Sequence, residues 1–127
     1  GLGALSLVKQ AKAELEKAIE LDPQALDGSA YTSLASLYYQ VPGWPIGFGD
    51  EDKAEALFKQ ALALNPNGID PNYFHGDFLL RQKRYAEARA ALEKALAAPD
   101  RAGREVADAG RRDEARALLA QVKEKLE

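Results

Sequence analysis

The chain has 127 residues, of which 46% are apolar and 29% are charged, so it suits one compact domain or one short solenoid and not a disordered tail. Its net charge of −3 lacks the basic excess that nucleic-acid binding normally needs. The absence of cysteine excludes disulfides, thiolate catalysis and cysteine-based metal sites, and it leaves the compartment open.

Helix-forming alanine, leucine, glutamate, lysine and arginine dominate, while valine, isoleucine and threonine are too scattered for a sheet, so the fold is expected to be all-α. No apolar run approaches the ~20 residues that span a bilayer, and no membrane insertion by this segment is expected. The chain has no methionine, even at position 1. We therefore expect a processed or trimmed product, and its localisation, cytoplasmic or bacterial periplasmic, stays open.

The first expected element is a helix that ends at Pro23, because Leu7, Ala11 and Leu15 recur at helical spacing before that proline. The segment AKAELEKAIELDP matches the later segment AEALFKQALALNP position for position. Both copies are predicted to be the second helix of a two-helix repeat. Residues 1–26 would then be a partial repeat that holds a second helix only.

The next repeat is expected over residues 27–67. Its first helix is SAYTSLASLYYQ, and its second helix is AEALFKQALAL, for which Asp50 is the predicted N-cap. Between them the turn is enlarged at residues 41–49, VPGWPIGFG, which carry the only tryptophan, two prolines and three glycines. This loop is the least generic part of the chain.

A third repeat is expected over residues 68–99, with Asp70 as the cap of its first helix DPNYFHGDFLLRQ. The small and large apolar residues of the preceding second helix recur there at a 34-residue offset, which indicates stacked helical hairpins. The paired positions are Ala54 with Ala88, Phe58 with Leu92, and Ala61 with Ala95. Residues 100–127, interrupted by Gly103 and Gly110, are predicted to form short C-terminal capping helices.

These residues resemble the tetratricopeptide repeat: Leu34, Ala35 and Tyr38 in one helix, then Phe58 and its small neighbours in the next. The resemblance implies a right-handed α-solenoid of antiparallel helix pairs, with about two full repeats and partial repeats at both ends. It implies a single domain over 1–127 whose first helices line a concave surface. A peptide or helix of another protein would bind in that groove, and no enzyme is implied.

The loop and the helix after it are also similar to the tetratricopeptide proteins that serve as the T component of TRAP transporters. That similarity implies an alternative function as a periplasmic transporter-accessory or small-solute-binding protein. A further alternative is a homo-oligomer that assembles through the unpaired N-terminal helix at residues 7–21.

The candidate partner-binding residues lie on the first helices of the two repeats and on the loop. They are Thr32, Ser36, Tyr39, Gln40, Trp44, Phe48, Tyr73, Asp77 and Arg81. Two interpretations of the loop stay open. Trp44 and Phe48 pack onto neighbouring helices as a satellite core, or they form part of a binding site, because tryptophan is enriched among residues that dominate binding energy.

Catalytic, metal and cofactor residues are not expected. His75 is the only histidine, and the nearby aspartates do not form a metal-ligand motif with it at recognisable spacing. Without cysteine or a second histidine, nucleophile–base pairs are nearly excluded, and no glycine-rich phosphate loop is present. The sequence therefore predicts a non-enzymatic protein.

Overall fold

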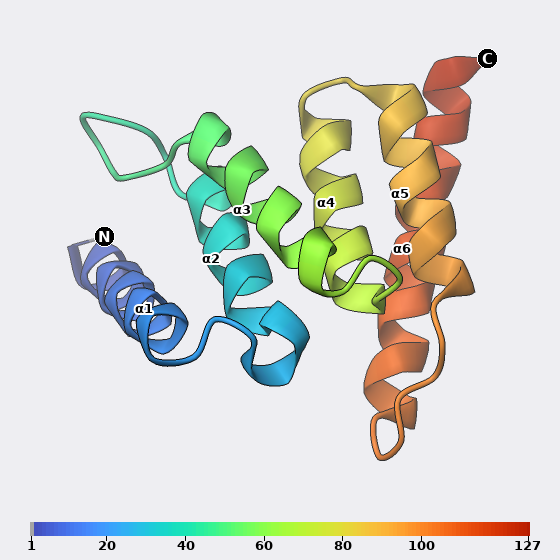
Figure 1. Ribbon diagram of the computed structural model, residues 1–127. Helices are drawn as coiled ribbons and strands as arrows, with labels where there is room; N and C mark the ends of the chain where they lie inside the picture. Colours follow the sequence, from blue (N-terminus) through green and yellow to red (C-terminus); the bar gives the residue numbers. More distant parts are fainter. Residues whose placement is uncertain (1) are drawn as a thin grey trace. The chain divides into compact units, whose positions relative to one another are not determined.

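A computed structural model describes residues 2–127, which form six α-helices and one short 3₁₀ helix (Figure 1). In chain order the elements are α1 (Leu2–Leu21), η1 (Ala25–Gly28), α2 (Ser29–Gln40), α3 (Glu51–Leu64), α4 (Ile69–Arg81), α5 (Tyr85–Ala97) and α6 (Glu105–Leu126). Contacts between residues divide the chain into two compact units, one that ends at Asn65 and one that begins at Pro66.

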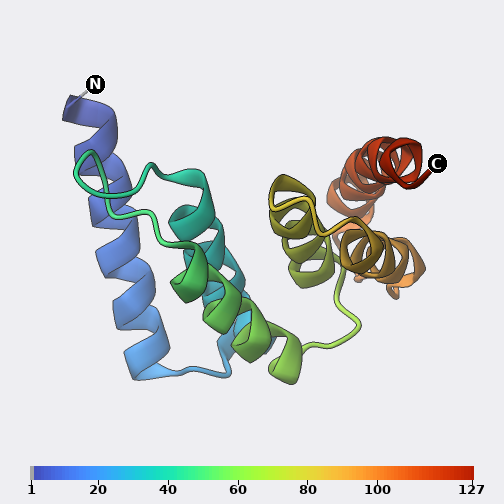
Figure 2. The ribbon, with the colours of Figure 1, turned by 90° about the horizontal axis from the view of Figure 1, so that it is seen from above.

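The first unit is built on α2, which packs against both α1 and α3 (Figure 2). The backbone N–H of Asp50, at the N-cap of α3, donates to the carbonyl oxygen of Tyr38 at 2.9 Å, so α2 and α3 form an antiparallel hairpin. The Asp50 side chain accepts a hydrogen bond from the Lys53 N–H at 3.0 Å, which confirms the predicted cap. Fully buried Phe58 and Ala35 lie in the core of this hairpin.

The second unit begins with the hairpin of α4 and α5, and α6 packs against both of these helices. Lys83 turns the chain in the left-handed region at φ 61°, and the N–H of Arg84 donates to the carbonyl of Leu79 at 2.9 Å. Phe78, Leu79 and Leu92 are at most 1% exposed and form the core of the unit. On α6 the buried apolar residues are Ala115, Leu119 and Val122.

The C-terminal region differs from its prediction, because α6 is one continuous 22-residue helix in place of short capping helices over 100–127. Gly110 does not interrupt it. A helix glycine costs only about 1 kcal/mol relative to alanine, and the surrounding residues are strong helix formers. Asp70 is also not the cap of α4: it lies inside the first turn, and the N-cap is Gly68. The expected single domain over 1–127 stays a prediction.

The glycine at position 76 gives α4 its close approach to α5. A Cβ atom there would lie 2.7 Å from Cγ and Cδ2 of Leu92. At Gly110 of α6, a Cβ atom would meet nothing within 4 Å. Replacement by alanine gives both positions the same gain in helix propensity. Only at Gly110 is there space for the added methyl group.

We expect Gly110→Ala to stabilise the protein by about 0.5 to 1 kcal/mol, and Gly76→Ala to be worse than Gly110→Ala by about 1 to 3 kcal/mol because of over-packing against Leu92. Urea unfolding of both variants measures this difference. Equal stabilisation by both would show that Leu92 moves aside at no cost, and it would contradict the prediction.

Candidate functional site

The loop between α2 and α3 is held closed by its own backbone. The carbonyl oxygen of Gly43 accepts hydrogen bonds from the N–H groups of Ile46 at 3.1 Å and Gly47 at 3.2 Å. The N–H of Gly49 donates to the carbonyl oxygen of Pro42 at 2.9 Å. Gly43 and Gly49 also form an isolated bridge, so the two stems of the loop run side by side. These bonds give the loop a defined shape although it contains no helix.

The large side chains of this loop point in different directions. Phe48 is half-buried, with its ring edge-on to Tyr38 at a centroid distance of 5.6 Å and with Lys12 Nζ 5.6 Å from its centroid. Trp44, by contrast, is 90% exposed, and Ile46 is 70% exposed. Phe48 therefore packs as satellite-core residues do, whereas Trp44 and Ile46 present apolar surface to solvent.

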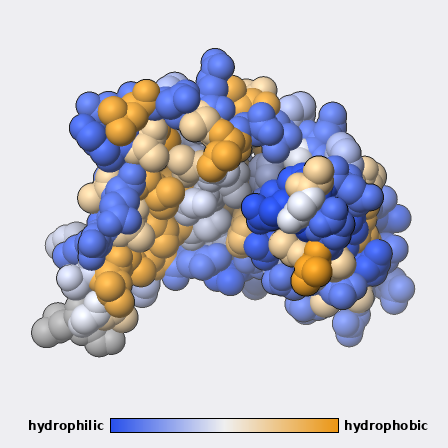
Figure 3. Space-filling model, turned by 90° about the horizontal axis from the view of Figure 1, so that it is seen from below, coloured by the Kyte–Doolittle hydropathy of each residue, from blue (hydrophilic) through white to orange (hydrophobic). Residues whose placement is uncertain are grey.

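A groove of about 680 Å³ lies between the loop and the first half of α1. Its lining residues, which define the apolar groove, are Ala4, Leu5, Val8, Gln40, Val41, Pro42 and Ile46. None of them is charged, and neither residues 1–8 nor residues 41–49 contain a charged residue. Figure 3 shows hydrophobic surface that extends from the N-terminal end of α1 across this unit. The groove therefore suits an apolar occupant.

Four of the predicted site residues lie on α2, and one of them, Thr32, is buried and not accessible to a partner. Thr32 is only 5% exposed. The helix α2 is covered by α1 as well as by α3, so fewer of its side chains reach solvent than the repeat alignment predicts. Ser36 and Tyr39 are half-buried. Ser36 Oγ donates to the Thr32 carbonyl at 2.9 Å. Gln40 is exposed, and its Nε2 donates to the Tyr39 hydroxyl at 3.2 Å.

Three further predicted residues lie on α4, in the second unit. Tyr73 is 9% exposed and not displayed, because α6 packs over it: its hydroxyl donates to Glu114 at 3.4 Å, and the Arg111 guanidinium lies 4.9 Å from its ring centroid. Burial, reinforced by the Glu114 charge, raises the pKa of Tyr73. Asp77 and Arg81 form an ion pair of 3.3 Å along the helix.

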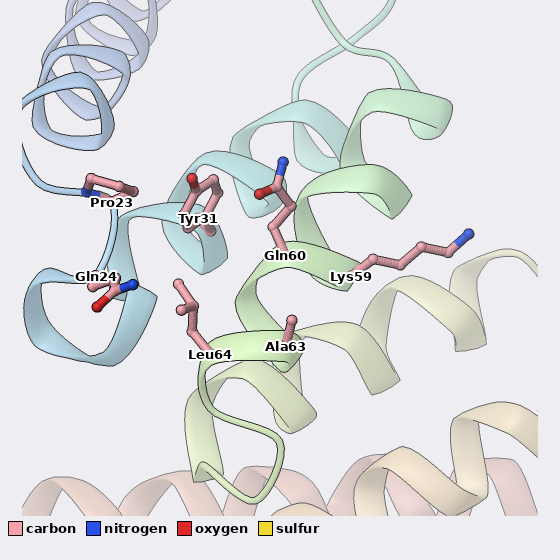
Figure 4. A pocket seen from close by; sticks show the side chains of 7 residues that line it. All are labelled: Pro23, Gln24, Tyr31, Lys59, Gln60, Ala63 and Leu64. Atoms are coloured by element: carbon pink, nitrogen blue, oxygen red, sulfur yellow. The ribbon is translucent and has the colours of Figure 1, made fainter.

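A second pocket, of about 350 Å³, was not expected from the sequence (Figure 4). It is lined by Pro23, Gln24, Tyr31, Lys59, Gln60, Ala63 and Leu64. These residues come from three segments that no spacing pattern connects. In Figure 4 Leu64 projects towards Tyr31, and the Lys59 side chain extends away from Pro23, so the ammonium group does not close over the pocket.

An ion-pair cluster in the second unit also escaped prediction. Asp108 is 1% exposed and accepts hydrogen bonds from Arg101, from the backbone N–H at 3.0 Å, from Nε at 2.9 Å and from Nη2. The Arg101 hydrogen bonds lower the pKa of Asp108 against the opposing effect of its burial. Asp70 Oδ1 accepts a hydrogen bond from Arg111 Nε at 3.0 Å. These interactions hold α6, and the segment before it, against α4.

Across residues 2–127, no helix combines the length and apolarity that a membrane crossing requires. In the same part of the chain, no three metal-ligating side chains converge on one point.

Two family models match the chain, and both describe a tetratricopeptide repeat. One matches residues 46–107 and the other matches residues 4–25. No curated protein matches the chain. The matches and the antiparallel helix pairs confirm the expected all-α helical-hairpin solenoid. Repeats of this family mediate contacts between proteins and are typically non-catalytic. Residues 4–25 and 46–107 of the chain are therefore similar to tetratricopeptide repeats.

Proposed function

We propose that this chain is a non-enzymatic scaffold that binds an apolar segment of another protein, with Trp44, Ile46 and the apolar groove as its contact surface. One observation carries the proposal: Trp44 is 90% exposed on a loop that its own backbone hydrogen bonds hold in shape. A large aromatic side chain presented in this way loses little conformational entropy when a partner covers it. Tryptophan that a partner buries on binding is also a frequent anchor of protein interfaces.

The proposal moves the binding surface away from the concave face that the sequence predicts. Thr32 and Tyr73 are buried and cannot contact a partner without rearrangement. Binding on the concave face by the remaining predicted residues of α2 and α4 stays a prediction. The apolar groove is favoured because it offers uncharged, uncovered surface of the kind that marks interaction sites.

The test is affinity capture of partners with the wild-type chain, with Trp44→Ala and with Val106→Ala as the matched control, because Val106 is 88% exposed on α6 in the other unit. Trp44→Ala should weaken binding of a captured partner by about 30-fold, as expected for an interface anchor. Its unfolding free energy should change by no more than about 0.5 kcal/mol. Equal capture by all three proteins would contradict the proposal.

A second candidate function is the binding of a small apolar solute. The volume of the apolar groove, about 680 Å³, lies within the range of small-molecule sites, roughly 300 to 1,000 Å³. This function agrees with the resemblance to the T component of TRAP transporters, which rests on the loop and the following helix and stays a prediction. Native mass spectrometry of the purified protein should then show a bound small molecule that Ile46→Asp removes.

A further inference from the structure

The turn before α4 contains a reactive pair of residues, Asn67 followed by Gly68. The chain has three asparagines, at positions 65, 67 and 72. An asparagine loses its side-chain amide when the backbone nitrogen of the next residue attacks its Cγ atom. This reaction needs an N–H group on the next residue and a carboxamide that is free to turn towards it. These two requirements separate the three asparagines.

Two of the asparagines are protected. Asn65 is followed by Pro66, which has no backbone N–H. The Asn72 side chain is only 2% exposed, and its Nδ2 atom donates to the carbonyl oxygens of Pro66 and Gly68, both at 2.9 Å. Asn72 also lies inside α4, where the N–H of the next residue belongs to the helical hydrogen-bond pattern. Neither residue therefore meets both requirements.

Asn67 has none of these protections. Its side chain is exposed. Within residues 2–127, neither its carboxamide nor the N–H of Gly68 forms a hydrogen bond. Gly68 has no side chain to hinder the approach of its nitrogen to Cγ of Asn67, and its backbone is the least restricted of any residue type. The attacking nitrogen and its target are therefore adjacent and unhindered.

We propose that Asn67 is a site of spontaneous deamidation in the folded protein. The Gly68 nitrogen gives its proton to solvent and forms a bond to Cγ of Asn67. The bond between Cγ and the amide nitrogen breaks, and this nitrogen takes a proton from solvent and leaves as ammonia. Water then opens the resulting five-membered imide at either of its two carbonyl carbons. The products are aspartate, or isoaspartate in which the main chain runs through Cβ and Cγ.

The reaction consumes one water and releases one ammonia, so it needs no oxidant, reductant or cofactor. Asn67 belongs to the second unit, whereas the contact surface of the proposed function belongs to the first. The inference therefore goes beyond partner binding and does not depend on it.

The Asn72 side chain makes the turn sensitive to which product forms. Its Nδ2 atom bridges the carbonyl oxygens of Pro66 and Gly68, which flank residue 67. Isoaspartate inserts one additional backbone atom between these two carbonyls, so the turn cannot keep both hydrogen bonds without being rebuilt. Aspartate adds a charge and leaves the length of the backbone unchanged. Isoaspartate therefore leaves a buried amide donor unsatisfied and destabilises the start of α4.

The reaction is tested by incubating the purified chain in mildly alkaline buffer at physiological temperature, both folded and in urea. Trypsin cleaves after Lys59 and Arg81 and releases all three asparagines in one peptide, residues 60–81. Mass spectrometry of this peptide should locate the exchange of NH₂ for OH at Asn67 and not at the other two. Reaction of Asn67 in urea but not in the folded chain would overturn the inference, because the fold would then protect the site.

Gly68→Ala tests the identity of the attacking nitrogen. The backbone of Gly68 has φ −73° and ψ 149°, which alanine adopts without strain. The variant should deamidate at least about tenfold more slowly, because alanine restricts the backbone and its methyl group hinders the attack. Circular dichroism verifies that the variant stays helical. An unchanged rate would show that water attacks the carboxamide directly, and it would overturn the proposed route.

The consequence for α4 is tested on the isoaspartyl chain, separated from the aspartyl chain by chromatography. It should unfold at a lower urea concentration than Asn67→Asp, the matched control that carries the same charge on a backbone of normal length. In an Asn72→Ala background the isoaspartyl form should cause no further loss, because the two hydrogen bonds are already absent. Equal unfolding of the isoaspartyl chain and Asn67→Asp would overturn the role given to Asn72.

Discussion

Asp108→Asn is expected to lower the free energy of unfolding by about 2 to 3 kcal/mol, the range for hydrogen bonds to a charged group. Asp108 is 1% exposed and accepts three hydrogen bonds from Arg101. Asparagine keeps the shape of the side chain but has an NH₂ donor in place of one carboxylate oxygen. Either this NH₂ group faces the N–H donors of Arg101, or one of those Arg101 donors loses its acceptor. The matched control is Asp113→Asn on the same helix, where the pair with Arg116 is exposed.

The control should cost less than about 0.5 kcal/mol, as exposed ion pairs do. Urea unfolding at pH 7 measures both variants. A loss as small for Asp108→Asn as for Asp113→Asn would show that the Arg101 hydrogen bonds contribute nothing beyond a surface pair.

The stabilisation by Asp108 should also depend on pH, with a sign that follows from its lowered pKa. The unfolded chain binds a proton at this carboxyl near pH ~3.9, and the folded chain binds it only at lower pH. The contribution is therefore fully present above about pH 4 and is lost as pH falls through the folded pKa. Unfolding curves of the wild type and Asp108→Asn should converge in acid, and a constant gap would contradict this assignment.

Gly49→Ala is expected to open the loop between α2 and α3 and to destabilise the first unit by about 3 kcal/mol, in the upper part of the range for over-packing. A Cβ atom at this position would lie 1.9 Å from the carbonyl oxygen of Val41 and 2.8 Å from the carbonyl carbon of Pro42. Both are backbone atoms that cannot rotate away, so the stems of the loop must separate. The apolar groove would then lose the wall that Pro42 and Ile46 provide.

Gly43→Ala is the matched control, because its Cβ atom would come no closer than 3.3 Å to the Gly49 carbonyl. It should cost less than about 1 kcal/mol and keep partner capture, whereas Gly49→Ala should lose capture as Trp44→Ala does. Thermal unfolding and capture with both variants make the comparison. If Gly49→Ala retains full stability and capture, the closed loop is not required for the groove.

The hairpins were predictable because their packing is periodic. The alternation of small and large residues around Phe58 and Leu92 repeats at a fixed offset, and each such position is buried. Asp50 was predictable for a local reason, since a carboxylate just before a helix satisfies the first free N–H groups. Repetition and local capping therefore gave the element order and the core of each hairpin.

The rest depends on contacts between residues that no period connects. Tyr73 is buried because α6 packs over it. The sequence did not predict that α6 continues through Gly110, because glycine is typical of turns. The pairing of Asp70 with Arg111 joins residues 41 positions apart on α4 and α6. Likewise, the exposure of Trp44 follows from backbone bonds within the loop. The candidate site was only half predictable, because sequence indicated an unusual loop but not which aromatic ring leaves the core.

Trp44 is the only tryptophan and lies in water in the folded protein. Its fluorescence emission is therefore expected to be that of a hydrated indole before and after denaturation, so an emission scan would report almost nothing as the helices melt. The same property makes the indole a built-in optical reporter of occupancy. A blue shift on addition of an unlabelled, tryptophan-free peptide would signal that the loop tip has been covered.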